Sequence, residues 1–173
     1  MTDRSDAHTA TTPLAGRRVL VTGGSTGIGR ATAVLLASEG AKVFVCGRDE
    51  QHLQDALARI REVGEGDGMA IDLAEESNVA RLFEAATKYL GGLDVAVINA
   101  ARGAEGISEM SEADLRYTIG SNFTAYLLSA QEATKAMGAY GKDAKGKGDI
   151  VLVGSMSAYV LGAGSTVYAG IKY

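Results

Sequence analysis

Short apolar runs alternate with amphipathic stretches along this chain of 173 residues, and this alternation restricts its fold more than any other feature. The apolar runs predict five strands, at residues 18–22, 43–46, 69–71, 93–98 and 150–153. The amphipathic stretches predict helices at residues 28–38, 50–63, 77–90 and 111–137. Apolar strands alternating with helices are typical of a parallel sheet covered on both faces, and right-handed crossovers favour a doubly wound α/β fold.

Composition excludes several classes of function. Hydrophobic residues make up 46% of the chain and charged residues 22%, with a net charge of −4, so no basic surface indicates nucleic-acid binding. No apolar run approaches the roughly 20 residues that a membrane-spanning helix needs. Residues 1–13 carry charges and no apolar stretch, which predicts a flexible tail rather than a signal peptide, followed by one domain over residues 14–173. The single cysteine, Cys46, is expected to be a small buried residue and fits a reducing cytoplasm.

A glycine-rich stretch stands directly between the first predicted strand and the first predicted helix. Glycines at such a place permit a tight turn and a close approach of the backbone to a pyrophosphate, which the free N–H groups of the helix N-terminus then bind. The alternative is a glycine-rich turn without a ligand, but the position in a βαβ unit favours a dinucleotide. The residues predicted to contact it are Thr22, Gly23, Ser25, Thr26, Gly27, Ile28 and Gly29.

The end of the second predicted strand reads Cys46-Gly47-Arg48-Asp49 and bears on the choice of nicotinamide cofactor. Rossmann domains that bind NAD place an acidic residue here to accept hydrogen bonds from the adenosine ribose. Here Gly47 leaves room, and the Arg48 guanidinium is suited to clamp a 2′-phosphate, which favours NADP(H) over NAD(H). Two alternatives stay open: Arg48 as a mere surface cation, and Asp49 as its neutralising partner or a ribose ligand.

The spacing T-G-x-x-x-G-x-G resembles that of the short-chain dehydrogenase/reductase family, whose members bind nicotinamide cofactors on a Rossmann-type sheet. By this resemblance, Asp72 and the neighbouring Leu73 contact the adenine, although an acid at a helix N-terminus is an alternative for Asp72. After the fourth strand, Asn99 and Ala100 match the family's Asn-Asn-Ala-Gly, whereas Ile98 and Ala101 depart from it.

Tyr168 is followed four residues later by Lys172, and residues four apart share one face of a helix. A nearby ammonium favours the phenolate and makes the tyrosine a usable general acid or base. Ser155 lies thirteen residues earlier, at the end of the fifth predicted strand, and this is the catalytic arrangement of the family. The resemblance adds Asn122 as a fourth catalytic residue that holds a water in a proton relay with Lys172; a satisfied polar residue on a helix flank is its alternative.

The resemblance implies a cytoplasmic, NADP-dependent oxidoreductase that transfers hydride between NADPH and a carbonyl or alcohol, with Tyr168 and Lys172 also touching the cofactor and no metal. The family's sheet has seven strands, of which five are present up to Tyr173. The alternative is therefore a nucleotide-binding fragment without catalysis, or a subunit that a second chain completes. Residues 159–161 are expected to line one wall of the substrate pocket, and the helix at 115–137 to form the interface of a homodimer or homotetramer.

Overall fold

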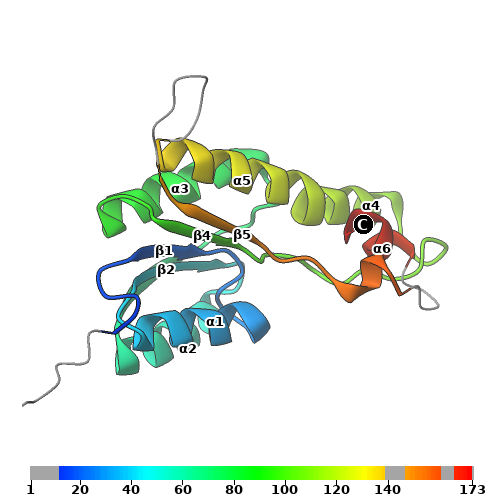
Figure 1. Ribbon diagram of the computed structural model, residues 1–173. Coiled ribbons are helices and arrows are strands. Elements are labelled where there is room, and N and C mark those ends of the chain that lie inside the picture. Colours follow the sequence, from blue (N-terminus) through cyan, green and yellow to red (C-terminus); the bar gives the residue numbers. More distant parts are fainter. Residues whose placement is uncertain (1–11, 139–146, 161–165, 173) are drawn as a thin grey trace, which may run out of the picture.

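The computed structural model describes residues 12–138, 147–160 and 166–172, and these form a parallel sheet between two layers of helices (Figure 1). The strands are β1 (Arg18–Val21), β2 (Lys42–Gly47), β3 (Glu65–Ala70), β4 (Val95–Ile98) and β5 (Asp149–Leu152). They pair in the order β3-β2-β1-β4-β5, and each pair is parallel. This is the predicted doubly wound, Rossmann-type α/β fold.

Five helices lie where the amphipathic stretches predict them, with shifts of one or two residues at some ends. They are α1 (Gly27–Ser38), α2 (Glu50–Val63), α3 (Glu76–Leu90), and α4 (Glu112–Ile119) and α5 (Ala125–Ala136), which divide the last predicted helix. The short α6 (Thr166–Lys172) carries Tyr168 and Lys172 and was not predicted from an amphipathic stretch. Figure 1 shows α1 and α2 on one face of the sheet and α3 and α5 on the other. Ser111 caps α4 by accepting a hydrogen bond from the backbone N–H of Asp114, 3.1 Å away, as its sequence predicts.

Strand residues alternate between the two faces and build two cores. Leu20 and Phe44 point to the α3 and α5 side, whereas Val19, Val21 and Val43 point to the α1 and α2 side. All five are nearly or fully inaccessible to solvent. Burial of apolar side chains on both faces explains why β1 and β2 read as continuous apolar runs instead of an alternating pattern.

The third strand is longer than predicted and begins earlier, at Glu65 instead of residue 69. Its sequence, EGDGMA, lacks the β-branched residues that identify a strand, because there is no space for them. A Cβ on Gly66 would lie 2.4 Å from Ile60 Cγ2, and one on Gly68 would lie 2.5 Å from the Val45 carbonyl oxygen. Glycines thus let this edge strand pack closely under α2 and against β2.

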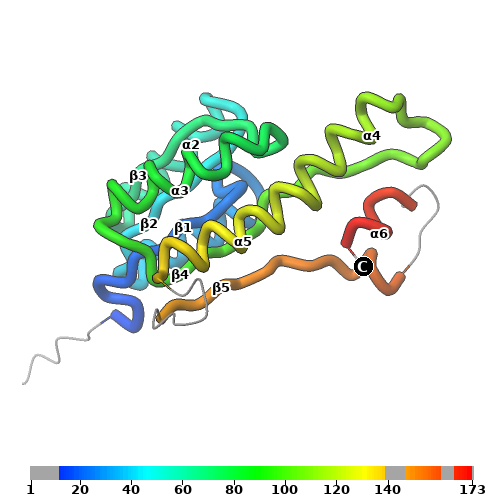
Figure 2. The backbone as a smooth tube through the Cα atoms, turned by 90° about the horizontal axis from the view of Figure 1, so that it is seen from above, coloured from blue at the N-terminus to red at the C-terminus, as the bar shows by residue number. Residues whose placement is uncertain are grey.

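The predicted helix over residues 111–137 is interrupted by one wide turn. Between α4 and α5 the backbone forms a π-helical segment, η1 (Gly120–Thr124), in which the Ala125 N–H donates to the Gly120 carbonyl five residues back. Such an insertion widens one turn and is frequent at functional sites. Figure 2 shows α4 and the following helical turns extending past the sheet, with α6 beside them.

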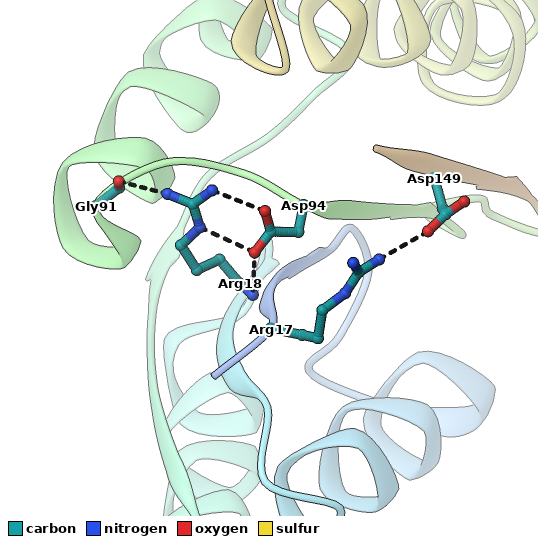
Figure 3. Close-up of polar contacts among 5 residues, drawn as sticks. All are labelled: Arg17, Arg18, Gly91, Asp94 and Asp149. Carbon is teal, nitrogen blue, oxygen red and sulfur yellow. Dashed lines mark hydrogen bonds and ion pairs between the residues drawn. The ribbon is translucent and has the colours of Figure 1, made fainter. Parts of the chain in front are cut away.

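Ion pairs hold the amino edge of the sheet, opposite the ends where the predicted site residues lie (Figure 3). Arg18 on β1 makes a two-pronged contact with Asp94 just before β4, at 2.7 and 2.9 Å, and also donates to the Gly91 carbonyl. Arg17 reaches Asp149 on β5 at 2.7 Å, but this pair is much more exposed. The Arg18 hydrogen bond keeps the pKa of Asp94 at about 2, below its usual value.

Candidate functional site

The predicted site residues come together at one edge of the sheet. Parallel strands end at the same edge, so the segments after β1, β2, β3, β4 and β5 are brought side by side there. These segments carry the glycine-rich loop, Arg48, Asp72, Asn99 and Ser155. The carboxyl edge of a doubly wound sheet is where such folds bind ligands.

The glycine-rich loop is locked to β4 by the side chain of Thr22. Its buried hydroxyl accepts the backbone N–H groups of Asn99 and Ala100, each at 3.0 Å. The Asn99 amide returns the contact by donating to the carbonyls of Thr22 and Gly23, at 3.1 and 3.3 Å. Thr22 and Asn99 therefore shape the loop from within, a role that the sequence did not reveal.

Two glycines of the loop are needed for close contact between backbones. A Cβ on Gly29 would lie 2.2 Å from the Gly23 carbonyl oxygen, and one on Gly23 would lie 2.9 Å from the Ala100 Cα. Gly27 has a positive φ of 52°, which suits glycine, and a Cβ there would meet nothing within 4 Å. The loop ends in α1, whose first turn offers free N–H groups beside this glycine. This cradle fits a pyrophosphate.

Gly47 at the end of β2 makes room for a neighbouring side chain. A Cβ on Gly47 would lie 2.1 Å from Ser25 Oγ and 2.5 Å from Ser25 Cβ. The prediction that Gly47 leaves room for a 2′-phosphate is wrong, because Ser25 of the glycine-rich loop fills this space. An acidic side chain at position 47 would collide with the loop.

Asp49 does not neutralise Arg48 in the structure. Its carboxylate caps α2 by accepting the His52 backbone N–H at 2.8 Å. The exposed Arg48 instead donates to the Tyr117 hydroxyl at 2.8 Å. That hydroxyl donates in turn to the Asp72 carboxylate at 2.5 Å. Sequence reasoning missed Tyr117, which comes from α4 and is distant from both partners along the chain.

Asp72 opens a turn that precedes α3 and does not cap that helix. Its carboxylate accepts the Ala74 N–H at 3.0 Å, and its carbonyl accepts the Asn78 side chain at 2.9 Å, while α3 begins only at Glu76. The alternative of an acid at the helix N-terminus is therefore wrong. Leu73, the next residue, is buried in the core on the α3 side.

Asn122 is the centre of the π-helical segment and is almost fully buried. Its amide oxygen accepts the Arg102 backbone N–H at 2.8 Å, and its amide nitrogen donates to the Arg102 carbonyl at 2.7 Å. Asn122 thus fastens the chain after β4 to the helix. These bonds fit the alternative of a satisfied polar residue, and the catalytic role stays a prediction.

Two short elements carry the predicted catalytic residues and pack against each other. Ser155 is the residue directly before the 3-10 turn η2 (Met156–Ala158), and Tyr168 and Lys172 lie on α6. The Ser155 hydroxyl accepts the Ser157 N–H at 3.1 Å, which leaves its own proton available. The Lys172 ammonium donates to the Val153 carbonyl at 3.3 Å and lies 4.9 Å from the centre of the Tyr126 ring. Burial lowers the pKa of Lys172.

The remaining predictions concern the substrate pocket, the N-terminal tail, Cys46 and a metal. Tyr159 and Val160, predicted to line the substrate pocket, are 80% and 64% exposed, and residue 161 lies outside the described residues, as do residues 1–11 of the predicted tail. Cys46 is buried, as expected, and burial raises its pKa to about 12. Within the described part of the chain, no group of His, Cys, Asp and Glu could hold a metal ion. There, too, each helix is too short or too polar to cross a membrane.

Known proteins resemble this chain in sequence and in fold. The family model of the short chain dehydrogenases matches residues 17–173. A hydroxysteroid 11-beta-dehydrogenase 1-like protein of Danio rerio is 33% identical over 165 residues, which cover 92% of this chain and 55% of the relative. This chain thus spans only about half the length of that relative.

Two solved structures show how far the likeness extends. A short chain dehydrogenase of Burkholderia cenocepacia in complex with NADP is 31% identical with a TM-score of 0.81, over 92% of this chain and 64% of that one. A xylitol dehydrogenase with bound NAD+ is 24% identical with a TM-score of 0.83, over 92% of this chain and 61% of that one, and shows the fold alone. The matched family model, which covers almost the whole chain, establishes that the chain belongs to the short-chain dehydrogenase/reductase family.

Proposed function

We propose that this chain forms the cofactor-binding and catalytic part of an NADP-dependent oxidoreductase, which transfers hydride between NADPH and a carbonyl or alcohol. The observation that carries the proposal is the convergence of the glycine-rich loop, the Arg48 and Asp72 pair, and the elements of Ser155, Tyr168 and Lys172 on one sheet edge. A dinucleotide is long enough to span such a row, from its adenosine to its nicotinamide.

The pyrophosphate would lie on the glycine-rich loop. Gly23 and Gly29 keep the backbone free of side chains where Cβ atoms would collide, and the α1 N-terminus supplies a positive dipole end. Ser25, Thr26 and Ile28 complete the proposed contacts. Ile28 is 72% exposed, which leaves its side chain open to a ligand lying over the loop.

The adenosine end favours NADP over NAD. The Arg48 guanidinium is exposed, and among the described residues Tyr117 accepts one of its N–H groups, so we expect its other N–H groups to be open to a 2′-phosphate. The position of the ribose-binding acid is taken by Gly47, where any side chain would strike Ser25. Since NADP-bound and NAD-bound proteins share this fold, these local residues decide the preference.

At the other end, NADPH supplies a hydride to the carbonyl carbon when it is bound. Ser155 donates its free proton in a hydrogen bond that orients the substrate oxygen, and Tyr168 delivers a proton to that oxygen. One N–H group of the Lys172 ammonium donates to the Val153 carbonyl, and its other two N–H groups donate to the hydroxyls of the nicotinamide ribose. Asn122 holds the water that returns protons to Lys172.

The test is oxidation of NADPH, followed by its absorbance, in the presence of a panel of aldehydes and ketones. We expect turnover with at least one carbonyl and its loss in Tyr168→Phe, whose Kd for NADPH changes by less than about twofold because only the proton donor is removed. Full activity in Tyr168→Phe would reject Tyr168 as the acid. Binding of NADPH without oxidation by any carbonyl would support a nucleotide-binding chain that lacks catalysis.

The exposed apolar side chains of the long helix support assembly of identical subunits. Ile119, Phe123 and Leu127 follow one another at intervals of four residues and are 41%, 48% and 52% exposed. They lie within the stretch that the sequence predicts as a subunit interface. We expect a homodimer or homotetramer that buries them, and a lower mass in light scattering for Leu127→Glu.

A further inference from the structure

A chain of three side chains crosses the adenosine end of the proposed cofactor site, and its middle member, Tyr117, comes from α4. Arg48 Nη1 donates to the Tyr117 hydroxyl at 2.8 Å, and the hydroxyl contacts Asp72 Oδ2 at 2.5 Å. Arg48 follows β2, and Asp72 follows β3, so the phenol joins two neighbouring strand ends. Neither the motifs of the sequence nor the role proposed above for Arg48 requires a residue at this place.

The direction of both hydrogen bonds follows from the chemistry of the groups. A guanidinium has only donors, so the phenol oxygen must accept from Arg48. Its single proton then points to the carboxylate of Asp72. Burial and the hydrogen bond to Asp72 raise the pKa of Tyr117, so the phenol keeps that proton at neutral pH. The acceptor for Arg48 is therefore a neutral phenol oxygen. Its hydrogen bond to the Asp72 carboxylate fixes the rotation of the hydroxyl and so the direction of its lone pairs.

The tyrosine ring is itself held in place. The Arg102 guanidinium lies 5.0 Å from the centre of the ring, at a distance typical of a cation–π contact. The backbone of Arg102 is clamped on both sides by the buried amide of Asn122. The hydroxyl that meets Arg48 thus belongs to a ring with little freedom, whereas the long Arg48 side chain would otherwise sample many rotamers.

We propose that Tyr117 is a positioning residue for cofactor choice: its hydroxyl orients Arg48 toward the 2′-phosphate and so strengthens the preference for NADPH over NADH. The inference rests on the proposed function, because it assumes that Arg48 reads the phosphate. Arg48 uses one N–H of Nη1 on the phenol, which leaves its other N–H groups free for phosphate oxygens. Pre-orientation lowers the entropy lost when the phosphate is bound.

The experiment is a fluorescence titration of the protein with NADPH and with NADH, which differ only in the 2′-phosphate. In Tyr117→Phe we expect NADPH to bind about fivefold more weakly and NADH to change by less than about twofold, because one hydrogen bond to a charged group is lost. Any effect of the vacated Asp72 carboxylate on adenine binding is common to both cofactors. The preference ratio, which is the Kd for NADH divided by the Kd for NADPH, therefore isolates the effect on the 2′-phosphate.

Two further variants separate positioning from general damage. Tyr89→Phe is the matched control, because its hydroxyl contacts Glu65 at 3.4 Å at the amino edge of the sheet, and its ratio should equal that of the wild type. Arg48→Met should abolish the preference for NADPH, and adding Tyr117→Phe to it should change the ratio no further. An unchanged ratio in Tyr117→Phe, or a further decrease of the ratio in the double variant, would overturn the inference.

The same titrations separate failure of the inference from failure of the proposed function. If Arg48→Met leaves the preference intact, or the wild type binds neither cofactor, the proposed function itself is overturned and the inference with it. If Arg48→Met removes the preference and Tyr117→Phe does not reduce it, only the role of Tyr117 is wrong.

Discussion

At the scale of single residues, Thr22 shows how one hydroxyl shapes a whole site. It is fully buried and accepts two backbone N–H groups, those of Asn99 and Ala100. The sequence predicted Thr22 and Asn99 as separate cofactor contacts. Their mutual contact could not be predicted, because it joins segments about 77 residues apart in the chain. The same holds for Tyr117, whose partners follow two different strands.

We predict that Thr22→Val, which keeps the shape of the side chain, lowers the free energy of unfolding by about 1–3 kcal/mol, because two partly buried N–H groups lose their acceptor. Urea denaturation followed by circular dichroism measures this change. The control is Thr87→Val on α3. The Thr87 hydroxyl donates to the Phe83 and Glu84 carbonyls, so its loss leaves no backbone N–H without an acceptor. Equal destabilisation by the two variants would contradict the role given to Thr22.

At the scale of elements, the sequence predicted the type and order of strands and helices, but not where each element departs from regular geometry. The glycines of β3 hid the first residues of that strand, because closeness to Ile60 and Val45 selected glycine at positions 66 and 68, and glycine has low strand propensity. The π-helical turn around Asn122 leaves the apolar pattern of its helix readable, so no sequence signal marks it. Both departures are consequences of tertiary packing.

The loop that we propose to bind the pyrophosphate depends on the close approach of Gly29 to the Gly23 carbonyl. We predict that Gly29→Ala weakens NADPH binding at least about tenfold, because its Cβ would lie 2.2 Å from that oxygen and displace the loop. Gly103→Ala is the control, since a Cβ there meets nothing within 4 Å. Titration with NADPH measures both, and wild-type affinity in Gly29→Ala would refute the close contact.

At the scale of the whole molecule, the ion pair of Arg18 and Asp94 joins the two central strands at the edge opposite the site. The pKa of Asp94 is about 2 in the folded protein, against 3.8 as its ordinary value. A carboxyl whose folded pKa is lowered stabilises the protein above its unfolded pKa and loses that contribution as pH falls through the folded pKa. The contribution should therefore be complete above about pH 5 and disappear toward pH 2.

We predict that Asp94→Asn lowers the free energy of unfolding by about 1–2 kcal/mol at pH 7, after allowance for partial exposure, and that the difference shrinks as pH falls below 4. Denaturation at several pH values measures it. Asp149→Asn removes the exposed pair with Arg17, whose side chains are 71% and 42% exposed, and should have almost no effect. A difference between wild type and Asp94→Asn that is independent of pH down to 2 would contradict this account.

We propose above that the carboxyl edge of this sheet binds NADP(H) in preference to NAD(H). The measurement is a titration of the unaltered protein with NADPH and with NADH, followed by the fluorescence of each reduced nicotinamide. We expect saturable binding of both, with a Kd for NADPH at least about tenfold lower, because a charge-assisted pair forms between Arg48 and the 2′-phosphate. Equal affinity for the two cofactors, tighter binding of NADH, or no binding of either would contradict it.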